Sequence, residues 1–116
     1  MKKIVFVLLF ISGVLTTVSA QVKVGLASYY HNKWHGRRTT SGERYHKDSL
    51  TCAHKTYPFG TRLRVTCFTT GKTVTVRVND RGPHRKTRII DLSYAAARQI
   101  GMIHLGITKV QVEKLN

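Results

Sequence analysis

Short runs in which apolar and polar residues alternate recur along this chain, and they limit its fold more than any other feature of the sequence. Such alternation is typical of β-strands that bury one face, because successive side chains point to opposite faces of a sheet. One helix is indicated at 94–100, with Ser93 or Asp91 as its N-cap and Gly101 as its stop. Several short strands and one short helix predict a mainly β fold, a small closed barrel. The alternating runs are residues 22–27, 61–67, 74–79 and 109–113.

The first twenty residues have the pattern of a secretory leader. Lys2 and Lys3 precede a largely apolar stretch at 4–18, and small residues stand at Ser19 and Ala20. This pattern predicts a signal peptide at 1–20 and one exported domain at 21–116, in the periplasm or cell envelope. A retained membrane span is the weaker alternative, because the apolar stretch is short and interrupted by polar residues. No cysteine stands at the expected cleavage point, so we expect no stable membrane anchor.

The domain left after cleavage is strongly basic. The chain has 20 lysines and arginines against five acidic residues, so losing Lys2 and Lys3 leaves a net charge of +13. This charge indicates an anionic partner, and in an exported protein an acidic envelope polymer is favoured over nucleic acid. A cationic antimicrobial or nucleic-acid-binding protein is the minor alternative.

Two of the five carboxylates are candidates for catalysis. Asp80 follows the run at 74–79 and precedes Gly82-Pro83, so it lies at the end of a rigid strand. Glu43 lies in a long polar loop at 31–49, and such loops in small domains are often functional. If the fold brings them together, they form an acid/base pair suited to glycosidic bonds. A turn residue and a solvated loop acid are the alternatives. We interpret the other three as a turn residue, a helix cap or arginine partner, and a solvated strand residue: Asp48, Asp91 and Glu113.

Other side chains suggest substrate contacts. His54 precedes a turn at 57–60 and could hydrogen-bond a catalytic carboxylate, although a purely structural histidine fits equally well. Tyr30 and Trp34 have aromatic faces that could stack on sugar rings, with closure of the barrel core as the alternative. Arg37 and Arg81 are candidate contacts for an anionic substrate or are merely solvated. The six histidines lack a recognised ligand spacing, so we predict no metal and no other cofactor.

Cys52 and Cys67 are the only cysteines of the chain. An even number of cysteines in an exported protein predicts a disulfide between them. Two buried free thiols are the alternative.

Five segments, taken in order, resemble the rare lipoprotein A (RlpA) family of double-psi β-barrel proteins. The resemblance implies a six-stranded double-psi barrel with one or two short helices. It also implies an endolytic lytic transglycosylase that acts on peptidoglycan glycan strands in cell wall remodelling or cell separation. The segments are GLASYY at 25–30, TSGERY at 40–45, LTCAHKTYPFGT at 50–61, VNDRGP at 78–83 and RIIDLS at 88–93.

The resemblance also assigns roles to residues. By motif position, the family's catalytic aspartate falls on Asp80, its acidic partner on Glu43 and its active-site histidine on His54. We expect Asp80 to act as acid and base on the β-1,4 bond between N-acetylmuramic acid and N-acetylglucosamine, leaving 1,6-anhydro ends. Glu43 would assist in charge stabilisation or proton transfer, and His54 would orient one carboxylate. A monomer is expected, and a non-catalytic, expansin-like peptidoglycan-binding module is the alternative function.

Overall fold

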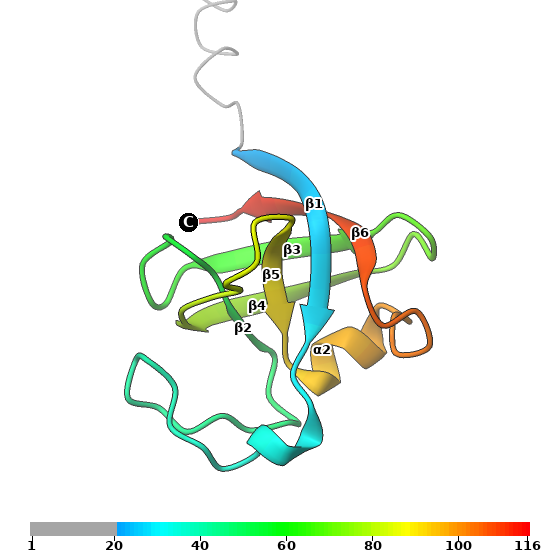
Figure 1. Ribbon diagram of the computed structural model, residues 1–116. Helices are drawn as coiled ribbons and strands as arrows, with labels where there is room; N and C mark the ends of the chain where they lie inside the picture. Colours follow the sequence, from blue (N-terminus) through cyan, green and yellow to red (C-terminus); the bar gives the residue numbers. More distant parts are fainter. Residues whose placement is uncertain (1–20) are drawn as a thin grey trace, which may run out of the picture.

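The computed structural model describes residues 21–116, and the expected signal peptide at 1–20 lies outside this range. Six strands close into a barrel in the order β1-β5-β2-β4-β3-β6 (Figure 1). A one-turn 3-10 helix, η1 (Asn32–Trp34), follows the first strand, and one α-helix, α2 (Tyr94–Gln99), precedes the last. The mainly β, six-stranded barrel expected from the sequence is therefore confirmed. The strands are β1 Val22–Tyr29, β2 Thr51–Ala53, β3 Arg62–Cys67, β4 Thr73–Asp80, β5 Arg88–Leu92 and β6 Thr108–Lys114.

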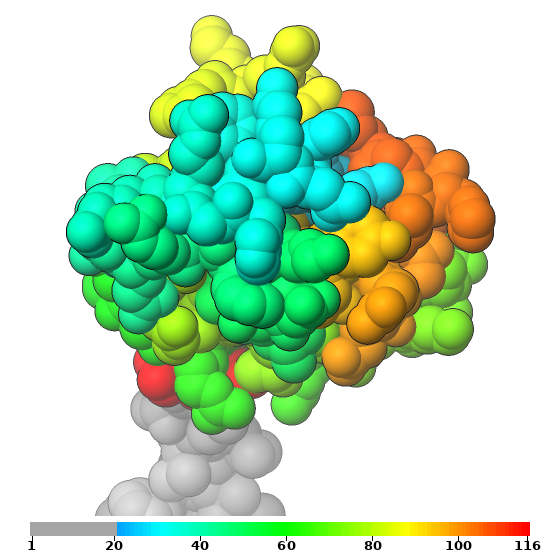
Figure 2. Space-filling view, turned by 90° about the horizontal axis from the view of Figure 1, so that it is seen from below, coloured from blue at the N-terminus to red at the C-terminus, as the bar shows by residue number. Residues whose placement is uncertain are grey.

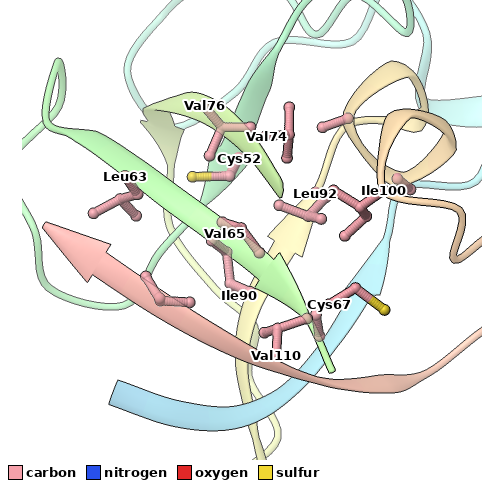
Figure 3. Packing of buried hydrophobic residues seen from close by; sticks show 14 of the residues in the cluster. Cys52, Leu63, Val65, Cys67, Val74, Val76, Ile90, Leu92, Ile100 and Val110 are labelled. Atoms are coloured by element: carbon pink, nitrogen blue, oxygen red, sulfur yellow. The ribbon is translucent and has the colours of Figure 1, made fainter. Parts of the chain in front are cut away.

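The alternating runs fill the inside of the barrel with aliphatic side chains. In β3 and β4 every second residue is buried, and the two strands form the expected antiparallel hairpin with Val65 opposite Val74. Figure 3 shows these side chains packed against Leu92 of β5 and Ile100, which follows α2. Burying each such side chain contributes roughly 1.5–3 kcal/mol, so the shared core holds the strands together.

Two parallel strand pairs bring several strand ends to one end of the barrel. β1 runs parallel to β5 with Ser28 opposite Asp91, and β2 runs parallel to β4 with Ala53 opposite Asp80. Because β2 also pairs with β5, Ala53 opposes Asp91 as well. Two aspartates therefore flank one small buried residue on neighbouring strands, and residues that oppose each other across a sheet share a face.

The α-helix begins and ends as the sequence indicated, but only one of the two proposed caps is used. Ser93 is the N-cap, and its side chain accepts a hydrogen bond from the backbone N–H of Ala96. Gly101 follows the helix with a φ of +75°, a conformation that favours glycine. Asp91 instead belongs to β5, so its interpretation as a helix cap is wrong. Between residues 21 and 116, no helix has the length and apolar character needed to cross a membrane.

The expected disulfide between Cys52 and Cys67 does not form, and both residues are buried free thiols. Cys52 lies opposite Val78, whereas the backbone N–H of Cys67 donates to the carbonyl oxygen of Lys72 at the other end of β4. Six residues of strand correspond to about 20 Å, far beyond the Cα separation of about 4.4–6.8 Å that a disulfide allows. Figure 3 shows the two sulfur atoms on different sides of the packed cluster.

We therefore expect reductants to leave the stability of this domain unchanged. Thermal unfolding should have the same midpoint with and without dithiothreitol, and both thiols should react with a thiol reagent only once the protein is unfolded. Burial raises the pKa of the Cys52 thiol, which further slows its reaction in the folded state. A midpoint that falls on reduction, or an unfolded chain without titratable thiols, would contradict the free-thiol assignment.

Candidate active site

A hollow of about 840 Å³ opens at the end of the barrel where β1, β4 and β5 meet the loop that follows β1. Figure 2 shows this loop (cyan) spread over the molecule as seen from below, with the connection between β4 and β5 (yellow) along one side. Two carboxylates, Asp80 and Asp91, line the hollow together with six lysines and arginines. The basic residues are Lys33, Arg37, Arg38, Arg81, Arg85 and Arg88.

Asp80 ends β4 and is held by three hydrogen bonds. Oδ1 accepts from the backbone N–H groups of Thr40 (2.8 Å) and Arg81 (2.9 Å), and Oδ2 accepts from the Tyr30 hydroxyl at 2.5 Å. Burial by itself would raise the pKa of Asp80, but these hydrogen bonds outweigh burial and bring the pKa below its ordinary value. Asp80 is therefore an ionised carboxylate in a fixed orientation.

Asp91 is the second carboxylate of the hollow, and the sequence analysis did not select it. It lies on β5, half-buried, and the Ser28 hydroxyl of the paired strand donates to its Oδ1. Burial raises the pKa of Asp91; the hydrogen bond from Ser28 only partly offsets this, and the nearby charge of Asp80 raises the pKa further. The two aspartates thus face one hollow with pKa values shifted in opposite directions.

The backbone register fixes the separation of these two aspartates. Both oppose Ala53, so their backbones are two strand spacings apart, roughly 10 Å. Gly82, with a φ of +131°, lies close to the same place, since a Cβ added there would be 3.9 Å from Asp91 Oδ2. Gly82 lines the hollow together with Asp80 and Asp91, and its lack of a side chain leaves space beside the two carboxyl groups.

Glu43 lies next to this site, but its carboxylate does not reach into it. Among the described residues it is bound by Arg77 (2.9 and 3.0 Å) and by the Asn79 amide (3.1 Å), and it is absent from the lining of the hollow. The hydrogen bonds from Arg77 and Asn79 lower the pKa of Glu43. The loop that carries Glu43 also presents the Thr40 N–H to Asp80. The structure therefore brings this loop to Asp80, and Glu43 attaches the loop to β4 through Arg77 and Asn79.

The His54 side chain contacts the segment that follows it in the chain and not a catalytic carboxylate. Its Nδ1 accepts from the backbone N–H groups of Thr56 (3.2 Å) and Tyr57 (3.1 Å), and its ring stacks on the Tyr57 ring with centroids 4.2 Å apart. Burial and the neighbouring cations, first Arg81, lower the pKa of His54 to about 4, so the ring is neutral near pH 7. Within the part of the chain that the structure describes, the ring makes no hydrogen bond to a carboxylate, so the expected orienting contact is not formed.

The aromatic candidates divide into a partly buried support, Tyr30, and an exposed platform, Trp34. The Tyr30 ring stacks on Tyr45 with centroids 4.4 Å apart, and the Tyr45 hydroxyl accepts from the backbone N–H of Tyr94. Tyr30 therefore supports Asp80 from a fixed position. Trp34 is 40% exposed at the edge of the hollow, and the cationic groups of Lys33 and Arg37 lie 5.4 and 5.3 Å from its ring.

Arg81 is only partly available to a ligand. Its guanidinium donates to the carbonyl oxygens of His54 (3.3 Å) and Tyr57 (2.9 Å) and lies 4.1 Å from the centre of the Phe59 ring. Arg81 therefore ties the 54–59 segment to the end of β4, while Arg37 remains the freer of the two predicted arginines. Among residues 21–116, no group of three or more potential ligands could hold a metal ion.

Comparison with known proteins gives consistent matches. Residues 22–112 match a family model described as lytic transglycolase, a double-psi β-barrel family, so the double-psi fold is confirmed. The chain is 50% identical over 93 residues to the probable endolytic peptidoglycan transglycosylase RlpA of Synechocystis sp., covering 80% of this chain and 29% of that protein. It is 50% identical over 95 residues to the endolytic peptidoglycan transglycosylase RlpA of Haemophilus influenzae, covering 82% and 33%. The chain thus spans about a third of the length of these relatives.

Solved structures share the barrel at lower identity. A Streptomyces papain inhibitor superposes with a TM-score of 0.67 at 23% identity, covering 83% of this chain and 96% of that one. A mutant expansin of Clavibacter michiganensis in complex with cellohexaose superposes with a TM-score of 0.66 at 22% identity, covering 83% and 51%. At this identity the likeness concerns the fold alone.

Proposed function

Because the chain belongs to the RlpA-like lytic transglycolase family, we propose that it cleaves the β-1,4 bond between N-acetylmuramic acid and N-acetylglucosamine in peptidoglycan glycan strands, leaving 1,6-anhydro ends. The observation that carries the proposal is the pair Asp80 and Asp91, which line one open hollow and whose pKa values are shifted in opposite directions. Two carboxyl groups whose surroundings drive their pKa values apart are suited to act as acid and base.

The surroundings of the two aspartates favour a division of roles that differs from the sequence expectation. Asp91 carries the proton and donates it to the glycosidic oxygen as the bond to the muramoyl C1 breaks. The muramoyl C6 hydroxyl attacks C1, and its proton passes to the ionised Asp80. Asp91 ends as the carboxylate and Asp80 as the acid, so exchange of one proton with solvent restores the site. In this proposal Glu43 and His54, which the sequence placed in catalysis, hold loop segments in position and do not transfer protons.

Charge and aromatic surface support binding of a sugar polymer. Muramic acid that has lost its stem peptide carries a free carboxylate, so such strands are polyanions. The six lysines and arginines of the hollow attract them, and salt weakens this attraction. Trp34 offers a flat, exposed face between two cations at the edge of the hollow, suited to stacking on a sugar ring.

Digestion of purified, peptide-free sacculi tests the function. Mass spectrometry should detect 1,6-anhydromuramic ends with the wild-type protein, and Asp48→Asn, which removes an acid outside the hollow, should give the same ends. Binding to the sacculi without any such ends would support the alternative, a non-catalytic peptidoglycan-binding module. Export to the envelope and the monomeric state belong to the same proposal. Cell fractionation checks the export, and gel filtration of the purified protein checks the monomeric state.

The pH dependence of cleavage should be bell-shaped. Activity needs ionised Asp80, so it falls as pH drops through the lowered pKa of Asp80. It also needs protonated Asp91, so it falls as pH rises through the raised pKa of Asp91. The two limbs therefore lie on either side of the ordinary aspartate value of about 3.9. Tyr30→Phe removes a hydrogen bond to Asp80 and should move only the acid limb, toward higher pH, in plots of kcat/KM. A profile without an alkaline limb would contradict the role of Asp91.

A further inference from the structure

A second hollow, of about 340 Å³, lies near the start of β1 and contains His54 and Tyr57. The connection between β4 and β5 lines the first hollow and contacts a residue of the second. Lys55, which lines the second hollow, donates from Nζ to the carbonyl oxygen of Arg85 (3.0 Å), and Arg85 lines the first. The second hollow is thus a separate depression that shares one wall with the candidate active site.

The lining of this second hollow combines an apolar part with a cationic part. Ile89, which is partly exposed, supplies most of the aliphatic surface, since Val112 is only 2% exposed, and Lys23 and Lys55 supply two exposed ammonium groups. None of the residues described from 21 to 116 contributes a carboxylate to it. A ligand that suits this lining has one negative charge beside small apolar groups.

The polar groups of the second hollow further limit which ligands fit it. The Tyr57 hydroxyl, 3.3 Å from Gln21 Oε1, can also hydrogen-bond a sugar hydroxyl. Lys114 lies 5.8 Å from the centre of the Tyr57 ring and adds a third positive charge nearby. The lining offers lysines but no arginine, so it attracts an anion by charge, without the bidentate fork with which arginine binds carboxylate or phosphate. On the proposed glycan substrate, the anionic group is a carboxylate.

We propose that the second hollow binds a muramic acid unit without its stem peptide, belonging to the strand whose cleavage site lies in the first hollow. Its carboxylate pairs with Lys23 and Lys55, and its lactyl and acetyl methyl groups lie against Ile89 and Val112. The choice of sugar rests on the proposed function. Lys23 and Tyr30 are seven residues apart on and just beyond β1, about 23 Å, so only a strand several sugars long occupies both hollows.

Two-site binding favours long strands, because the second contact forms within an existing complex. Lys23→Gln/Lys55→Gln should weaken binding of long peptide-free strands by about tenfold or more. The matched control, Lys72→Gln/Lys109→Gln, removes the same charge away from both hollows and should weaken it much less. Fluorescence anisotropy with the inactive Asp91→Asn protein as background measures this binding without cleavage.

Changes in amide NMR chemical shifts locate the binding site. N-acetylmuramic acid titrated into the Asp91→Asn protein should shift the amides of Lys23, Thr56 and Tyr57, and N-acetylglucosamine, which lacks the carboxylate, should shift them much less. The shifts should vanish in Lys23→Gln/Lys55→Gln and persist in the control. Equal shifts with both sugars, or shifts confined to the first hollow, would overturn the proposal. Neither the anisotropy nor the NMR measurement needs turnover. If the protein makes no anhydro ends but shows these shifts, only the proposed cleavage is disproved and the second binding site stands.

Discussion

Asp91→Asn is expected to reduce the formation of 1,6-anhydro ends by about 10²–10⁴-fold, the usual contribution of a general acid. Asparagine keeps the shape of the side chain and can still accept from the Ser28 hydroxyl, but it has no acidic proton to give the leaving oxygen. Rates are measured on peptide-free glycan by mass spectrometry. Binding of the strands should change little, because the six cations of the hollow remain.

Stability separates this loss from unfolding. The pKa of Asp91 is raised in the folded protein, so ionising it near neutral pH works against folding. That unfavourable contribution is absent at pH values below the pKa that Asp91 has in the unfolded chain, and it is complete above the pKa that Asp91 has in the folded protein. Asparagine never ionises, so the variant should melt no lower than the wild type near pH 7. If Asp91→Asn keeps its activity while Asp80→Asn loses it, the donor is Asp80, as the sequence suggested.

Glu43→Gln and Arg77→Gln are expected to cause the same loss of activity, up to about 10²-fold. The pair anchors the loop whose Thr40 N–H holds Asp80, and small displacements of a reacting group have effects of this size. An exposed ion pair contributes little to stability, so the melting temperature should hardly change. Initial rates on peptide-free glycan, compared with melting curves, give both quantities.

The double variant distinguishes a positioning role from a chemical one. If Glu43 acts only through Arg77, then Glu43→Gln/Arg77→Gln is no less active than either single variant. If Glu43 transfers protons itself, Glu43→Gln alone abolishes cleavage and Arg77→Gln retains most of it. Arg64→Gln, which breaks the ion pair with Glu113 away from the hollow, is the matched control and should keep full activity.

The sequence predicted the four strands that carry their own pattern and missed two that do not, β2 and β5. β3 alternates over its whole length and β4 as far as Val78, because one face is buried and the other is more exposed. β2 has only three residues, Thr51–Ala53, all of them buried, so no alternation marks it. The position of β2 between β4 and β5 is a non-local pairing that no local pattern records.

The same limit explains what the sequence showed of the site. Asp80 was found because a strand and a Gly-Pro turn frame it locally. Asp91 was missed because only the pairing of β5 with β1 and β2 carries it to the hollow. A signal was present, since Asp91 follows two apolar residues in a short strand-like run. The contact of His54 with a carboxylate is not formed, because the N–H groups two and three residues further along donate to its ring nitrogen, and this local preference overrides a long-range partner.

Ala53 stands between the two aspartates on a strand of only three residues, and this arrangement makes the proposed cleavage depend on complete barrel closure. Neither hairpin nor helix brings Asp80 and Asp91 within reach of one ligand; that requires β2 to enter between β4 and β5 and complete the ring. A partly assembled chain therefore contains both acids yet cannot use them together. During refolding, cleavage activity should return in a single step, at the moment when the last strand joins the barrel.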